Sequence, residues 1–516
     1  MKTPRPTVPS RRWWIAAAIA ATIALLGLPG EPFVHAAKAV PVCKAGKAVT
    51  LKGDIGPKQI NKYVELPFKV AKGVSKLIVT YGYPEGNTVL DLGIWDADGF
   101  GYKGFRGWSG SRQGRLPDQP PVVIQANKAS RNYNPAPIEP GKWHIELGVG
   151  HIDTKTSYKV TIKCGKVPLR KPPRPDPVDP NHVARPDAGW YFGDFHMHAH
   201  HSNLNAPTQA EFVTYAKDAG LDFMPITEYQ INRHWNEWGT TAEENPDLIF
   251  WPGREVITYF GHVGIIGETP GMVEYRHGYK DISMAEIQER SVAKGALFQI
   301  NHPTITPPPI DHLCRGCYWE LDDVIDYSMV DTIEVVNGSD GAEYFTEDAI
   351  DFWEEKLLTG HFIAPTGGSD DKLGPDYGVP ATAVYAEDLS RPALIEGIRA
   401  GHVWVAALGV AASPTIDFTA SAGDAEVMFG DTLEADAADF TVRVTNGIGQ
   451  LLRIYRDGVP FPTAAAIPIT TDDFTFEFEG TAADTDNPLG SYFRIETRTP
   501  QGLTTLGMPI FLAPPG

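Results

Sequence analysis

The middle of the chain carries histidine and carboxylate side chains at the ends of expected strands. The first group lies in Tyr191-Phe-Gly-Asp-Phe-His-Met-His198, where His196 and His198 share one face because side chains repeat every two residues along a strand. Two imidazoles on one face form half of a site for a divalent metal. A pair of surface histidines on an edge strand would give the same pattern, so the interpretation depends on further ligands.

Four more residues of metal-ligand type follow, each at or just after the end of an expected strand: Glu255, His262, His302 and Asp370. In a parallel α/β barrel the C-terminal strand ends converge on one mouth, where active sites lie. Nitrogen and oxygen ligands at that mouth suit one or two ions such as Zn²⁺, Mn²⁺ or Fe. A carboxylate such as Glu255 can bridge two ions, and two-metal sites favour hydrolysis of phosphate and related esters.

Composition divides the 516 residues into several parts. Residues 40–166 and 411–516 contain short runs of alternating apolar and polar residues, which predict an N-terminal and a C-terminal β-sandwich. Residues 167–188 form a proline-rich linker, because proline holds the chain extended. Between 189 and 410, helix-like patterns end at glycines that are followed at once by apolar strand starts, at Gly220, Gly295, Gly360 and Gly401. This recurrence predicts βα units and a mainly parallel α/β barrel or sheet.

The N-terminus is expected to be a targeting segment rather than part of the fold. Arg11 and Arg12 precede an apolar run from Trp13 to Leu28, and alanines follow soon after. That order is typical of a secretory signal over residues 1–36, and the arginine pair also fits the twin-arginine route. The run is short for a membrane span, so we expect a periplasmic or extracellular protein without a stable span. A formal net charge of -19 argues against non-specific binding of nucleic acid.

Export would permit disulfides among the four cysteines. Cys43 and Cys164 lie at the two ends of the N-terminal β region, where a bridge would close a long loop. For Cys314 and Cys317, which are separated by two residues, a local disulfide is favoured, with a redox pair and half of a thiolate zinc site as alternatives. No second Cys-x-x-Cys is present in the sequence to complete a zinc ribbon.

Taken in order, these motifs resemble the PHP (polymerase and histidinol phosphatase) superfamily, and more closely the metallohydrolases of the CehA/McbA type. The resemblance covers roughly residues 189–410 and extends toward the C-terminus. It rests on Gly193-Asp-Phe-His-Met-His198, Gly253-Arg-Glu255, His262, His302-Pro303, Ile333-Glu-Val-Val-Asn-Gly338 and Gly367-Gly-Ser-Asp370. It implies a distorted TIM-like (β/α)7 barrel with room for up to three metals. By matching position, the first metal would be held by His196, His198, Glu255 and Asp370, and the second by Glu255, His262 and His302.

The sequence departs from the family at two places. Thr227-Glu228-Tyr229 stands where the family has Thr-Asp-His, and Ser369-Asp370-Asp371-Lys372 stands where it has Ser-Asp-x-His. Both missing histidines belong mainly to the third metal position, for which His200 or His201 is the remaining candidate ligand. We therefore expect the third site to be empty or altered and the two-metal core to be kept. Lys372 could supply positive charge toward an anionic substrate and Tyr229 a hydrogen bond to a leaving group, or both could merely fill space.

The function expected from this ligand set is that of an exported metal-dependent hydrolase. A phosphoesterase that acts on a small phosphomono- or diester is the leading interpretation. A carboxyl- or carbamate-ester hydrolase is the alternative, because both reactions need activated water and stabilisation of a developing oxyanion. A non-catalytic extracellular binding protein on a degenerate barrel is the alternative of another class, since a fold alone does not establish activity.

Overall fold

The computed structural model describes residues 39–515, apart from positions 85, 87, 100–102, 118, 268–273, 339–342, 463, 465 and 483–486. The expected signal segment, residues 1–36, lies outside the described residues. Among those that are described, no helix is both long and apolar enough to cross a membrane.

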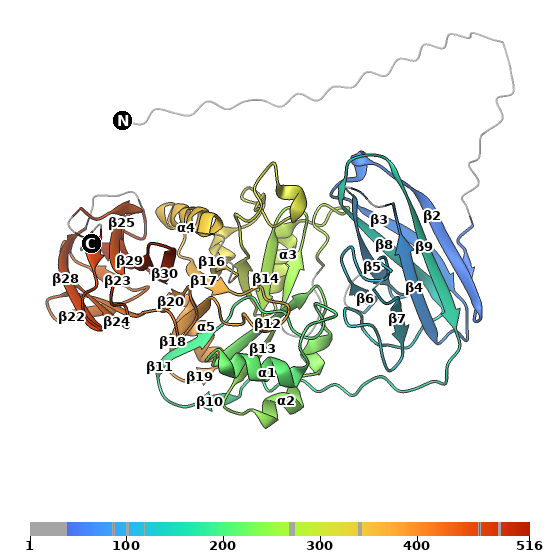
Figure 1. Ribbon diagram of the computed structural model, residues 1–516, viewed down its shortest axis with the longest axis horizontal. Helices are drawn as coiled ribbons and strands as arrows, with labels where there is room; N and C mark the ends of the chain where they lie inside the picture. Colours follow the sequence, from blue (N-terminus) through green and yellow to red (C-terminus); the bar gives the residue numbers. More distant parts are fainter. Residues whose placement is uncertain are drawn as a thin grey trace, which may run out of the picture. The chain divides into compact units, whose positions relative to one another are not determined.

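The N-terminal region consists of two sheets that enclose one apolar core (Figure 1). Alternating burial along its strands places every second side chain in that core, as the period of two requires. The Cys43–Cys164 disulfide links the two sheets, because its cysteines lie in β1 and β9. In sheet order, the first sheet contains β1 (Val42–Cys43), β3 (Tyr63–Val70), β8 (Gly141–Ile152), β5 (Thr88–Trp95) and β6 (Phe105–Trp108), and the second β2 (Lys47–Ile55), β9 (Thr156–Gly165), β4 (Lys76–Gly82) and β7 (Val122–Gln125).

After the proline-rich segment, one large sheet forms the centre of the molecule. Its strand β17 packs beside β18 and β20, so the sheet curls back on itself. In spatial order the central strands are β17 (Ala364–Gly368), β16 (Thr332–Asn337), β15 (Leu297–Ile300), β14 (His262–Ile266), β13 (Ile249–Ile257), β12 (Phe223–Tyr229), β11 (Gly189–Gly193), β18 (Ala381–Ala386) and β20 (Val403–Ala406). The short strands β10 (Val183–Arg185) and β19 (Leu389–Ser390) pair with each other outside this sheet.

The expectation of a mainly parallel sheet is wrong in part. Strands β11 to β13 and β15 to β17 are parallel neighbours, but β14 is antiparallel to both β13 and β15. The reason is the connection from β13 to β14, a tight turn in which Thr258 Oγ1 donates to the carbonyl of Gly261 at 2.7 Å. So short a turn joins only antiparallel strands, since a parallel crossover needs a dozen residues or more. Strand β18 is likewise antiparallel to β11 and β20.

Helices pack against strands of the central sheet, with α3 against β15, α4 against β16 and α5 against β18. The helix α1 begins with a capping box, in which Thr208 and Glu211 satisfy each other's backbone donors. The glycines expected to close the helical patterns all have positive φ, at +74° (Gly220), +80° (Gly295), +88° (Gly360) and +73° (Gly401). The α-helices are α1 (Gln209–Asp218), α2 (Gly239–Glu244), α3 (Met284–Val292), α4 (Glu343–Leu358) and α5 (Arg391–Arg399), with 3-10 turns at Pro57–Gln59, Arg233–Asn236, Asp311–Leu313 and Tyr327–Met329.

The C-terminal strands belong to two sheets, one of which is the central sheet. Strand β30 pairs with β20, so the central sheet continues into the C-terminal part across the expected boundary at residue 411. A single apolar core also runs through both parts, and the rings of Trp190 in the central part and Phe429 in the C-terminal part lie 5.9 Å apart between centroids. The continuing strands are β23 (Thr432–Glu434), β25 (Leu451–Arg456), β26 (Val459–Pro460), β27 (Ile467–Pro468), β29 (Ser491–Thr499), β30 (Gly502–Gly507) and β31 (Ile510–Ala513), and a second sheet holds β21 (Thr415–Ala422), β22 (Ala425–Met428), β24 (Ala437–Thr445) and β28 (Asp473–Thr481).

Candidate metal centre

The expected ligands come together where the central strands end. His196 and His198 lie just beyond β11, in a segment held on both sides by bridges from Met197 to Ile226 and to Asp371. Met197 faces away from the two histidines, and both imidazoles are fully buried. The strand thus ends earlier than expected, at Gly193, yet the alternation that places the histidines on one face persists.

The first cluster consists of His196, His198, Glu255 and Asp370, whose ligand atoms all lie within 4.8 Å of one another. Glu255 Oε2 is 3.4 Å from His196 Nε2 and 3.3 Å from His198 Nε2. Asp370 Oδ1 is 3.3 Å from His196 Nε2 and 2.9 Å from His198 Nε2. Two imidazoles and two carboxylates therefore meet at one point.

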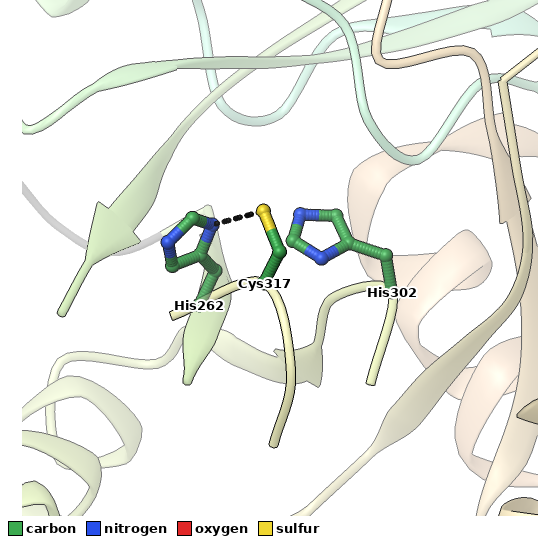
Figure 2. Close-up of side chains that lie close together, drawn as sticks. All are labelled: His262, His302 and Cys317. Carbon is green, nitrogen blue, oxygen red and sulfur yellow. Dashed lines mark hydrogen bonds between the residues drawn. The ribbon is translucent and has the colours of Figure 1, made fainter. Parts of the chain in front are cut away.

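The second cluster uses the other oxygen of the same carboxylate. Glu255 Oε1 lies 3.2 Å from His262 Nδ1 and 3.3 Å from His302 Nε2. The sulfur of Cys317 is also near, 3.9 Å from His262 Nδ1, and Figure 2 shows it between the two imidazole rings. Glu255 is thus the residue shared by the two clusters, one oxygen to each.

These donor sets fit divalent ions. Bonds of about 2.0–2.2 Å to nitrogen and oxygen at a tetrahedral angle place neighbouring donors about 3.4 Å apart, close to the separations around Glu255. Moreover, His196 Nε2 and Glu255 Oε2 are buried and make no hydrogen bond of good geometry within the described chain, although they face each other. A buried nitrogen lone pair opposite a buried carboxylate oxygen is costly unless a cation or proton lies between them.

Three imidazoles are fixed in orientation by contacts on the side away from the clusters. Nδ1 of His196 lies 3.1 Å from Glu334 Oε2, and Nδ1 of His198 lies 2.8 Å from Ser202 Oγ. Ser202 Oγ in turn donates to the carboxylate of Glu228. Nε2 of His262 is 3.4 Å from the carbonyl of Arg315. Such partners hold the proton on the outer nitrogen and leave the inner lone pair for a metal.

The electrostatics of the clusters favour positive charge. Burial lowers the pKa of His196, but the carboxylates of Glu334, Asp370 and Glu255 outweigh it and raise the pKa well above its ordinary value. Burial raises the pKa of Glu255, but the charge of His196 and the close contacts with the surrounding imidazoles hold it well below its ordinary value. A site that stabilises a proton on buried imidazoles through surrounding carboxylates also attracts a metal cation.

Close backbone contacts bring the ligand segments together. A Cβ on Gly368 would lie 2.4 Å from His196 Cβ and 2.7 Å from Glu334 Oε1, so only glycine permits this approach. Asp370 and His302 have φ of +49° and +30°, a region that non-glycine residues rarely adopt. Backbone strain of this kind persists where surrounding structure enforces it, often at functional sites.

Sequence reasoning missed two buried acids of the site. Glu334 contacts His196 and also accepts from the backbone N–H of His302 at 3.0 Å. Asp194 accepts from the backbone N–H groups of His196 and Ser369 at 3.0 and 2.9 Å, which ties two ligand segments together. The available signal was an acid within an otherwise apolar strand, as in Ile333-Glu334-Val335, because such a residue is buried only when it has partners.

The remaining expected site residues lie at different places. Tyr229 stacks near His198, with 4.2 Å between ring centroids, and Lys372 Nζ donates to the backbone carbonyl of Asp370 at 2.7 Å and contacts Asp370 Oδ1. His201 points elsewhere, with Nε2 2.6 Å from Glu237 Oε2, and it belongs to neither cluster.

A cavity of about 580 Å³ opens beside the clusters. It is lined by residues of the central region and of the N-terminal region, among them Trp108, Arg112, Tyr229, His262, Arg315 and Lys372. Three cationic side chains and one acid, Asp91, are among its lining residues. The cavity thus has the size and charge to admit a small anionic molecule.

No family model and no curated protein matches the sequence. Among solved structures, the chain is similar to a two-domain protein from Bacteroides vulgatus containing a predicted PHP-like metal-dependent phosphoesterase, at 15% identity and a TM-score of 0.34 over 64% of this chain and 99% of that one. A putative metal-dependent phosphoesterase from Bifidobacterium adolescentis is similar at 15% identity and a TM-score of 0.27, over 40% of this chain and 95% of that one. A lesion-specific endonuclease from Pyrococcus furiosus has the same identity and score, over 41% and 56%. The PHP superfamily, which the sequence motifs resemble, is therefore represented among the solved structures similar to this chain.

Proposed function

We propose that this chain is a metal-dependent hydrolase of the PHP superfamily, with a distorted TIM-like barrel that holds two divalent ions. The observation that carries the proposal is Glu255, whose two oxygens face two separate groups of histidines at 3.2–3.4 Å. His196, His198 and Asp370 would complete the first ion's ligands, and His262 and His302 the second's. When bound, the ions would supply activated water and stabilise negative charge on the substrate.

Side chains of the cavity favour a phosphoester over a neutral ester as the substrate. Arg112, Arg315 and Lys372 line the cavity, and guanidinium and ammonium groups bind phosphate oxygens well. Burial raises the pKa of Tyr229, which keeps the phenol protonated as a hydrogen-bond donor toward a leaving group. We therefore propose a small phosphomono- or diester as the substrate, with carboxyl and carbamate esters as the competing class.

The disulfides that bridge Cys43–Cys164 and Cys314–Cys317 accord with an oxidising compartment. We propose on this basis, and from the N-terminal sequence, that the protein acts after export.

The experiment combines metal analysis with a substrate panel. Purified protein should contain about two divalent ions per chain by elemental analysis and should cleave chromogenic phosphate esters faster than carboxyl esters. The His196→Ala variant should lose both properties, whereas His151→Ala should keep them, since His151 pairs with Asp153 and belongs to neither cluster. Protein with two ions and no activity on any ester would favour the binding-protein alternative, and protein without metal would contradict the proposal.

A further inference from the structure

A short disulfide loop presses against the second cluster. Cys314 and Cys317 are bonded to each other, and the loop between them approaches β13 and His262 closely. A Cβ on Gly316, which has φ of +91°, would lie 2.0 Å from the carbonyl of Thr258 and 3.0 Å from His262 Nε2. The loop also supplies the carbonyl of Arg315 to His262. The position of the Cys317 sulfur is therefore enforced by packing.

That sulfur lies at ligand distance from the second cluster. Cys317 Sγ is 3.9 Å from His262 Nδ1, and together with a His302 nitrogen the three atoms lie within 4.8 Å of one another (Figure 2). Zinc bonds of about 2.3 Å to sulfur and 2.0 Å to nitrogen at a tetrahedral angle place S and N about 3.5 Å apart. A disulfide sulfur carries no charge, but a thiolate is a strong zinc ligand.

We propose that reduction of the Cys314–Cys317 disulfide turns the second metal position into a closed thiolate site, in which Cys317 joins His262, His302 and Glu255. The inference rests on the metal core of the proposed function. In the oxidised form only the two imidazoles and the shared carboxylate face the ion, which leaves a coordination position open to water or substrate. Catalytic zinc sites keep such a position, and structural sites fill it.

The proposed reductant is a dithiol, which attacks the more accessible of the two disulfide sulfurs. Cys314 is half-buried and lines the cavity, whereas Cys317 is 6% exposed. One thiolate of the dithiol attacks Cys314 Sγ, the S–S bond breaks, and Cys317 leaves with the electron pair as a thiolate. The second thiol, deprotonated, attacks the mixed disulfide, releases Cys314, which takes up a proton, and closes the oxidised dithiol. Two electrons reach the protein, and one proton passes to solvent because Cys317 remains a thiolate.

This arrangement couples the metal to the redox state of the loop. A divalent ion held by His262, His302 and Glu255 would stabilise the leaving Cys317 thiolate, so attack at Cys314 is the favoured direction of opening. In a reducing compartment the second position would be closed, and oxidation would open it. We expect the reduced protein to bind zinc at this position at least tenfold more tightly, which corresponds to a midpoint potential about 30 mV higher in saturating zinc.

The test uses cobalt, because thiolate ligation to Co²⁺ gives a near-ultraviolet sulfur-to-metal charge-transfer band that nitrogen and oxygen ligands lack. Metal-depleted wild-type protein is titrated with Co²⁺ before and after treatment with dithiothreitol, which is removed first. The Cys314→Ser and Cys317→Ser variants are titrated without any reductant, so that the Cys43–Cys164 disulfide stays intact. The band is expected in reduced wild type and in C314S, and not in oxidised wild type or C317S.

Two results would overturn the inference, and they can be told apart. Cobalt bound in all forms without the band in C314S, or with an equal band in C317S, would exclude Cys317 as the ligand and leave the proposed function intact. Absence of cobalt binding in every form would refute the two-metal site itself. Elemental analysis of each sample distinguishes these cases.

Discussion

Replacing Glu255 by glutamine tests the central claim, that one carboxylate serves two ions. The exchange keeps the size of the side chain, removes its charge and turns one oxygen into an N–H donor. Glu255 is 2% exposed and each of its oxygens faces two imidazole nitrogens. Removing one partner of a buried charge pair costs about 3–5 kcal/mol. At about 1.4 kcal/mol per tenfold, affinity for each ion should fall by two to nearly four orders of magnitude.

The assay measures zinc stoichiometry and affinity by competition with a chromophoric chelator. Glu255→Gln should lose tight binding at both positions. The matched control is Glu334→Gln, the same chemical change at an equally buried acid that contacts His196 Nδ1 from the side away from the clusters. That change should cost only about 10- to 100-fold, as is typical for a partner that orients a ligand. Wild-type affinity for one ion in Glu255→Gln would refute the bridging role, even if the other ion were lost.

Three further changes probe the surroundings of the site and the fold. Ser202→Ala removes the partner of His198 Nδ1 and should weaken zinc binding at the first position about 10- to 100-fold, with the second unchanged in the same titration. Burial raises the folded-state pKa of Asp91 to about 7, above its unfolded value, so the folded protein holds the extra proton and loses stability as pH rises from about 4 to 7. Asp91→Asn should abolish up to about 4 kcal/mol of this decline in urea unfolding, and an unchanged pH slope would contradict it. Cys43→Ser with Cys164→Ser should lower the unfolding free energy by about 2–5 kcal/mol, and an unchanged urea midpoint would show that the bridge adds nothing.

The local sequence pattern was sufficient to predict the segments that carry the ligands. The alternation in Phe195-His196-Met197-His198 depends on backbone geometry alone, and it holds although the strand ends before it. The glycines that end helices could likewise be predicted from the sequence, because the left-handed backbone conformation after a helix is a local requirement. The six expected ligands lie in two groups that share Glu255.

Features that depend on contacts between distant parts of the chain could not be predicted from the sequence. The direction of β14 follows from a tight turn, yet its effect on the sheet depends on which strand pairs next. The expected boundary at residue 411 follows a change in composition, but the backbone pairing between β20 and β30 crosses it. The role of Glu334 could not be predicted, because its partner His196 is 138 residues away in sequence.

Lys372 shows how a replaced residue can act within the remaining core. Its Nζ contacts Asp370 Oδ1, the same oxygen that faces His196 and His198, so its charge adjoins the first metal position. Burial lowers the pKa of Lys372, but Asp370 and Tyr229 outweigh it and raise the pKa above its ordinary value, so the side chain is an ammonium near neutral pH. An ammonium fixed on Asp370 neutralises part of that carboxylate and also presents a cation to the cavity that it lines. Both effects would strengthen the binding of an anionic substrate. Under the proposed function, this ammonium would take the place of the charge of a third ion and would attract an anionic ester without a metal.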